Sequence, residues 1–245
     1  MQTGSRPWER TAQAVGRLME QGVPGRVEPL RELASAIRED LGRAPLRQAA
    51  EAIPELVVAV AQRLPVRDAT TLSRQHAGAN GDELAEQLIT ASARASATLG
   101  GLAGALSAVP AVTLARSVTV PAVLAAEAVL VAALELKLTA ELHEVYGQAL
   151  PGDTNAERIE GLLAAWATHQ PADRRVRQPG DLVSLLPEST KHAVRAALRR
   201  RLRCSTATLL PFLVGGVAGG ALNGRQTRRV GTDLRSKLSA SRGSL

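Results

Sequence analysis

The sequence predicts an all-α fold, a helical bundle whose central helices are rich in glycine and alanine. Three observations support this prediction. Aromatic residues make up only 2% of the chain, which leaves the core to Ala, Leu and Val, and small or straight-chain apolar residues suit packed helices better than strands. Apolar residues recur at spacings of three and four along much of the chain. No segment shows the strict apolar–polar alternation of a half-buried strand.

The N-terminal 64 residues are predicted to form amphipathic helices. Apolar stripes run through Trp8–Leu18, Val27–Leu41 and Leu46–Leu64, each with charged residues on the opposite side. The breaks "GVPGR" and "GRAP" separate them. Residues 65–82 show no period and contain turn residues, so we expect a long loop there.

The next segment, residues 83–238, is predicted to form a helical domain, and the length of the chain allows one large domain or two small ones. Asp82 is the expected N-cap of a helix that starts at Glu83. That helix leads into Ala95–Ala115, which contains no charged residue and is interrupted by Pro110.

A second long helix is expected to begin at Thr119 and Pro121, which resemble a cap and a first turn. It continues through "AVLAAEAVLVAALELKLTAELHEVYG". Thr154 and Glu157 have the spacing of a capping box for a helix that carries Trp166. A basic linker, "PADRRVRQPGD", leads to a last pair of helices, and residues 239–245 are expected to form a disordered tail.

Positive charge is concentrated near the C-terminus. The chain has a formal net charge of +7, and residues 188–245 hold 12 Lys/Arg against two acids, which is +10 and leaves −3 for the rest. A basic amphipathic helix next to an apolar run is typical of contact with anionic lipid. The residues expected to bind lipid are Lys191, Arg195, Arg199, Arg200, Arg201, Arg203, Arg225, Arg228 and Arg229. The alternative is a solvated face whose arginine content reflects a GC-rich genome.

Small residues four apart mark the two most apolar runs, Ala95–Ala115 and Ala207–Leu222. This spacing allows helix backbones to approach closely, in a membrane or in a tight core. Both runs contain a proline and are borderline as membrane spans, so burial in a domain core and insertion in lipid both remain open. The glycines expected to pack helices are Gly100, Gly104, Gly216, Gly220 and Gly224.

Two stretches, "LGGLAGALSAVPAVTLARS" with the later "ELHEVYG" and "LLPFLVGGVAGGALNGRQTRRVG", resemble the hydrophobic centre of the EcsC family. The resemblance covers residues 83–238 and is most specific at Tyr146–Gly147, Pro211, Gly215 and Asn223. It implies a helical, membrane-associated bacterial protein from a family named for an accessory to an ABC-transporter operon. The family offers no catalytic residues to transfer to this chain.

No catalytic, metal or cofactor site is expected. His143 and Glu144 lack the second histidine of a zinc helix, and the glycine-rich run lacks the Gly-Lys-Ser/Thr of a P-loop. The other histidines, His76, His169 and His192, lie in different segments. Cys204 is the only cysteine, so an intrachain disulfide is excluded and a reducing setting is expected.

These observations predict a non-enzymatic accessory or scaffold on the cytoplasmic side of the membrane. The N-terminus lacks the apolar core of a signal peptide, so secretion is not expected. The alternative is a basic helical protein, located in the cytoplasm, that binds nucleic acid or a protein partner. Phosphates would attract the C-terminal cations, but single-strand binders normally add stacking aromatics, and this region has only Phe212.

Overall fold

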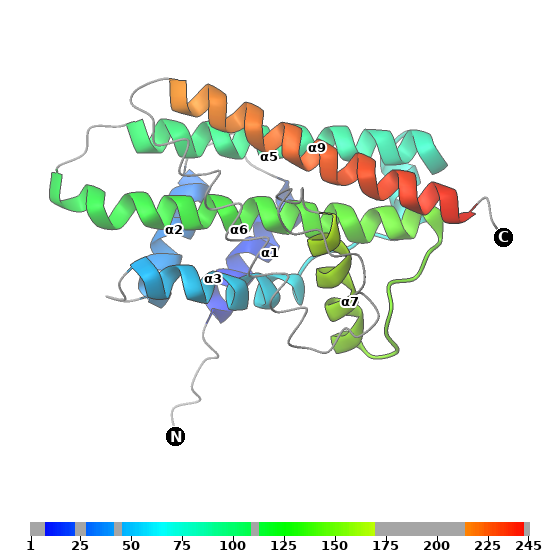
Figure 1. Cartoon of the computed structure of the whole chain (residues 1–245), viewed down its shortest axis with the longest axis horizontal. Coiled ribbons are helices and arrows are strands. Elements are labelled where there is room, and N and C mark those ends of the chain that lie inside the picture. The colour runs from blue at the N-terminus through cyan, green and yellow to red at the C-terminus, as the bar shows by residue number, and fades with distance from the viewer. Residues whose placement is uncertain (1–7, 23–27, 42–45, 109–112, 170–213, 243–245) are drawn as a thin grey trace, which may run out of the picture.

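A computed structural model describes residues 8–22, 28–41, 46–108, 113–169 and 214–242 of the chain. These residues form eight helices and no strand, which confirms the all-α prediction for the described part (Figure 1). The helices are α1 (Glu9–Gln21), α2 (Glu28–Leu41), α3 (Leu46–Ala61), α4 (Ala69–Gln75), α5 (Gly81–Ala108), α6 (Thr113–Tyr146), α7 (Asn155–Thr168) and α9 (Val214–Arg242).

The helices form three layers, with α6 in the middle (Figure 1). α5 and α9 lie side by side along one flank of α6, and α1, α2, α3 and α7 cover the other side. α5 and α9 run antiparallel, because Gly100 lies beside Gly219 whereas Ile89 lies beside Gly231. α6 contacts helices of both outer layers and is therefore the element around which the fold is built.

Burial of α6 follows from its sequence. Every residue from Ala122 to Leu142 is buried except Lys137, which is half-buried. A helix that is apolar on all sides must be enclosed on all sides to remove its surface from water. In the described part of the chain, none of the helices combines the length and the apolar character that a membrane span requires.

The N-terminal helices share one core with α6. Trp8, Leu33 and Val57 belong to the same apolar cluster as Val129 and Trp166. A second cluster joins α4, α5, α6 and α9 through Leu72, Ile89, Leu142 and Leu234 among others. The predicted stripes of α1 and α2 are the faces buried here, and charged residues such as Arg17 and Glu32 are exposed on the other side.

The segment 65–82, predicted as a loop, contains the short helix α4. Asp68 caps it by accepting a hydrogen bond from the Thr71 backbone N–H at 2.8 Å. Leu72 is the one residue of this helix that is fully buried. The prediction was wrong because a single anchoring side chain in seven residues produces no detectable period.

The two predicted starts of the long helices were also wrong. α5 begins at Gly81, which places Asp82 in the first turn, where its carboxylate accepts a hydrogen bond from the Tyr146 hydroxyl. α6 begins at Thr113, so Thr119 and Pro121 lie inside the helix rather than at its first turn. Pro121 has no N–H and leaves one main-chain hydrogen bond unmade, a local cost that the burial of the following turns offsets.

The C-terminal end of the fold differs from the prediction, whereas the start of α7 agrees with it. α9 continues to Arg242, so residues 239–242 are helical and not part of a disordered tail. Leu238 is buried and anchors the last turns of this helix. At α7, Thr154 and Glu157 form the predicted capping box, in which each side chain accepts a hydrogen bond from the other residue's backbone N–H.

Glycines set the close approach of α5 and α9. A Cβ atom added at Gly220 would lie 2.7 Å from the Ala97 carbonyl oxygen, and one at Gly100 would lie 2.8 Å from the Gly219 carbonyl oxygen. At Gly224 the nearest atom, the Ala93 carbonyl oxygen, would be 3.0 Å away. Gly104 is buried in α5. Gly216 lies in α9, but its surroundings are outside the described residues.

Candidate functional site

The outer face of α9 carries the described part of the predicted basic cluster. Arg225, Arg228 and Arg229 are exposed, whereas Asn223 and Thr227 on the inner face are buried. Leu222 is 47% exposed. Because residues three and seven positions apart share a helix face, Leu222, Arg225 and Arg229 form one stripe, which we call the α9 outer stripe.

The three arginines differ in their partners. Arg228 donates to Glu86 Oε1 on α5 at 2.5 Å, and Arg235 donates to Glu86 Oε2 at 2.6 Å. These exposed ion pairs contribute little to stability, but they direct Arg228 toward α5. Arg225 and Arg229 form no ion pair with a described acid. Among the three described arginines of the predicted cluster, these two therefore remain available for an external anion.

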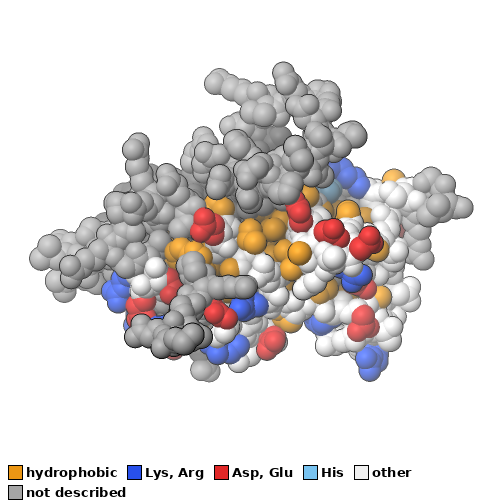
Figure 2. All heavy atoms as spheres, turned by 90° about the horizontal axis from the view of Figure 1, so that it is seen from below, with side chains coloured by type: hydrophobic (Ala, Val, Ile, Leu, Met, Phe, Trp, Pro, Cys, Tyr) orange, Lys and Arg blue, Asp and Glu red, His pale blue; other side chains and the backbone are white. Residues whose placement is uncertain are grey.

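The face of the molecule opposite α9 is not predominantly basic. Figure 2 shows hydrophobic side chains near its centre, with acidic and basic side chains intermixed around them. On α9, by contrast, Val214–Arg242 contains six Lys/Arg and one acid, Asp233. The rest of the predicted cluster lies outside the described residues: Lys191, Arg195, Arg199, Arg200, Arg201 and Arg203, together with His192 and Cys204.

A buried polar network lies beneath the α9 outer stripe. The Asn223 amide donates to Glu127 Oε1 on α6 at 2.6 Å. The Thr227 hydroxyl lies 2.9 Å from Glu135 Oε1 and 2.8 Å from the Ser96 hydroxyl of α5.

The same network reaches the opposite layer of the fold through α7. The Trp166 indole N–H donates to Glu135 Oε2 at 2.9 Å, and both residues are fully buried. Glu135 therefore links α6 to both α7 and α9. Because buried polar groups are costly unless their hydrogen bonds are made, this network fixes the relative positions of these helices.

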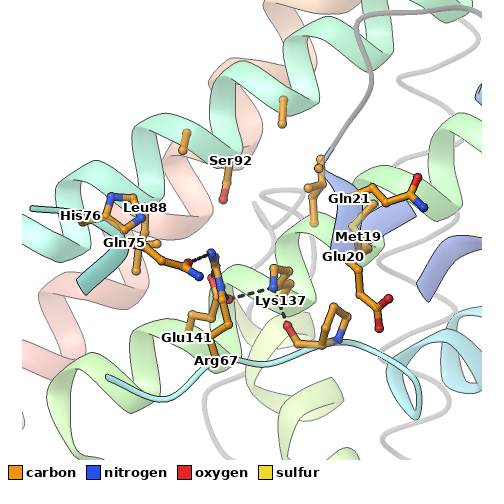
Figure 3. Close-up of a pocket in the computed structure, with 15 residues that line it drawn as sticks. Met19, Glu20, Gln21, Arg67, Gln75, His76, Leu88, Ser92, Lys137 and Glu141 are labelled. Atoms are coloured by element: carbon orange, nitrogen blue, oxygen red, sulfur yellow. Dashed lines mark hydrogen bonds and ion pairs between the residues drawn. The ribbon is translucent and has the colours of Figure 1, made fainter. Parts of the chain in front are cut away.

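A cleft of about 540 Å³ lies between α5, α6 and the C-terminal end of α1 (Figure 3). Arg67 donates from Nε to Glu141 Oε1 at 2.7 Å and from Nη2 to Oε2 at 3.0 Å. Lys137 lies one turn before Glu141 and forms an ion pair with it at 2.9 Å. Gln75 accepts from Arg67 Nη1 at 2.5 Å. The cleft therefore has two cations fixed at one side by a single buried carboxylate.

This polar cluster was not predicted from the sequence. Arg67 comes from the segment assigned as a loop and lies 74 positions from Glu141. The available signal was Lys137 and Glu141, spaced four apart in a mainly apolar helix. Such a pair on a buried helix face requires a polar environment, because isolated charges are costly to bury.

Two of the histidines that the sequence placed in different segments lie near the end of the bundle. His143 Nδ1 lies 3.0 Å from the Gln148 carbonyl oxygen, and His169 Nδ1 lies 2.6 Å from the Ala165 carbonyl oxygen. Burial lowers the pKa of both imidazoles below the ordinary value, and the neighbouring His169 lowers the pKa of His143 further. Asp233, 3.9 Å from His169 Nε2, acts in the opposite direction.

These pKa shifts predict that the protein loses stability in mild acid. The unfolded chain binds protons on these histidines at a higher pH than the folded chain, so stability falls as the pH drops below the ordinary histidine pKa of about 6.5. The wild-type melting temperature should therefore be lower at about pH 5.5 than at about pH 7.5. In the double variant His143→Gln and His169→Gln this decrease should be smaller. An equal decrease in wild type and variant would contradict the assignment to these two residues.

Comparisons with known proteins give no assignment. No family model, curated protein or solved structure matches this chain. The resemblance to the EcsC family therefore has no support from these comparisons, and the membrane association that it implies stays a prediction. Within the described residues, no group of three or more His, Cys, Asp and Glu side chains is placed to hold a metal ion.

Proposed function

We propose that this chain is a non-enzymatic accessory or scaffold protein that binds the anionic, cytoplasmic surface of a membrane through α9. The observation that carries the proposal is the α9 outer stripe, in which exposed Leu222 lies beside the exposed Arg225 and Arg229. An apolar side chain flanked by free cations suits the boundary between lipid head groups and acyl chains. The predicted basic helix with Lys191 and Arg199 would add to the same attraction.

The expected affinity for the membrane can be calculated from the charges of Arg225 and Arg229. Each Lys or Arg near an anionic membrane surface contributes about 1 kcal/mol. Arg225 and Arg229 together would therefore account for about 2 kcal/mol, or about a 30-fold change in affinity. This contribution is electrostatic and must weaken with salt, because raising the ionic strength from about 0.1 M to about 1 M shortens the screening length from about 10 Å to about 3 Å.

The test measures co-sedimentation of the full chain with phosphatidylcholine vesicles that contain about one third phosphatidylserine. The double variant Arg225→Gln and Arg229→Gln should bind about 30-fold more weakly than wild type, with unchanged helix content. A matched control, Arg10→Gln with Arg17→Gln, removes the same charge from the exposed side of α1. Equal binding of the two double variants would refute a specific role for α9.

Leu222 separates the membrane from a nucleic acid as the partner. Leu222→Ser should weaken binding to the anionic vesicles, because the side chain loses its apolar contact with lipid. The same variant should leave binding to duplex DNA unchanged, because the attraction to phosphates depends on the arginines. If wild type prefers DNA to anionic vesicles at matched salt, the membrane proposal fails and nucleic-acid binding replaces it.

A further inference from the structure

The cleft between α5 and α6 has two chemically different sides (Figure 3). Arg67, Lys137 and Glu141 lie at one side, and Met19, Glu20 and Gln21 at the end of α1 lie across from them. α5 supplies one wall with Leu88, Ala91, Ser92 and Ala95, which recur at helical spacing, and Leu134 of α6 adds to the apolar lining. The volume of about 540 Å³ is in the range of small-molecule sites.

Arg67 and Lys137 each have N–H groups that form no hydrogen bond within the described part of the protein. A guanidinium has five N–H groups, and Arg67 uses three of them, two to Glu141 and one to Gln75. A lysine ammonium has three N–H groups, and Lys137 uses one to the Pro65 carbonyl and one to Glu141. Three donors on two cations therefore have no acceptor among the described residues.

The acids near the cleft do not cancel this capacity. Glu141 is already engaged, because both of its oxygens accept from Arg67 and one also pairs with Lys137. Glu20 is exposed and lies close enough to favour the charged form of Lys137. The Ser92 hydroxyl lines the same cleft and makes no hydrogen bond to a described residue. The donors left on Arg67, Lys137 and Ser92 can therefore bind an anion, although Glu20 also lines the cleft.

From this arrangement we propose that the cleft binds a small carboxylate with an aliphatic body. The carboxylate accepts hydrogen bonds from Arg67 and Lys137, and the aliphatic part lies along Ala91 and Ala95 of α5. Charge-assisted hydrogen bonds to a guanidinium supply orientation, and the apolar wall supplies the contact area. This site is independent of the α9 outer stripe.

The environment of Lys137 supports the proposal. Its side chain is only 13% exposed, and burial lowers the pKa of its ammonium, while Glu141 acts in the opposite direction. A partly desolvated ammonium gains more from a second anion than a fully hydrated one does, because a low local dielectric strengthens the attraction. A bound carboxylate would restore the solvation that burial removes.

The test is calorimetric titration of the full chain with octanoate below its micelle concentration. Wild type should bind one octanoate, and octan-1-ol and inorganic phosphate should each bind at least about tenfold more weakly, because each lacks one half of the required chemistry. Arg67→Gln should weaken octanoate binding about tenfold. The charge-matched control Arg63→Gln should not, because Arg63 pairs with Glu9 and does not line the cleft.

A second variant keeps the test decisive if loss of Arg67 disturbs the fold. Ala91 is exposed and lines the cleft, so Ala91→Trp fills the space without removing a charge. It should abolish octanoate binding while the circular dichroism spectrum stays that of wild type. The double variant Arg225→Gln and Arg229→Gln should bind octanoate normally. Absence of octanoate binding to wild type, equal binding of octan-1-ol or phosphate, or full binding by Ala91→Trp would each overturn the proposal.

Discussion

Replacing Gly220 with leucine is expected to destabilise the protein by about 3 kcal/mol, at the upper end of the usual cost of overpacking. Its added Cβ would lie 2.7 Å from the Ala97 carbonyl oxygen, which is closer than real Cβ atoms approach other atoms. The clash is with backbone, so no side chain can rotate to relieve it, and α5 and α9 must separate. For a chain of this size the melting temperature should fall by about 6 to 12 °C.

The neighbouring position provides the control. Ala221 is exposed on the same helix, so Ala221→Leu adds a comparable side chain without meeting α5. Its effect on stability should stay within about 0.5 kcal/mol. Urea unfolding followed by circular dichroism measures both variants. If Gly220→Leu proves as stable as Ala221→Leu, α5 and α9 are not held at the separation described.

The parts of the fold that could be predicted are those with a strong local signal. α1 and α2 each bury one face, so their apolar stripes appear directly in the sequence. The capping box of α7 was predictable because its two residues are three positions apart and each accepts a hydrogen bond from the other's backbone N–H. The helix start that was predicted at Thr119 and Pro121 was wrong, because a local pattern does not show tertiary contacts. A proline is common at a first turn, but here tertiary contacts extend α6 through it.

The candidate sites depended on contacts that no local pattern contains. Arg225 and Arg229 could be identified as candidate lipid-binding residues because the density of basic residues is visible in the sequence. Only the structure shows that Arg228 instead donates to Glu86. The cleft required Arg67 to meet Glu141, which lies 74 positions away in the sequence. Likewise, Asn223 was noted in the sequence without its partner, Glu127, because the α6–α9 register was unknown.

Trp166 is the second position at which a substitution is expected to cause a large loss of stability. It is fully buried on α7 and packs in the same cluster as Val129 and Leu163, so Trp166→Ala should cost about 4 kcal/mol through lost contacts and the cavity left behind. Trp166→Phe keeps most of the volume and removes the N–H that donates to Glu135 Oε2. It should still cost about 2 kcal/mol, because a buried carboxylate oxygen loses its hydrogen bond from the indole N–H.

Trp8 is the matched control for the hydrogen bond. The chain has two tryptophans, and Trp8 belongs to the same apolar cluster but makes no indole hydrogen bond to a described residue. Trp8→Phe should therefore cost less than about 1.5 kcal/mol, the usual limit for swaps that nearly conserve volume. Guanidinium unfolding with an unchanged m-value would show that both variants change stability without changing the surface exposed on unfolding. If Trp166→Phe costs no more than Trp8→Phe, the bond to Glu135 contributes nothing measurable. In that case packing alone holds α7 against α6, and the link from α7 through Glu135 to Thr227 of α9 is not an energetic one.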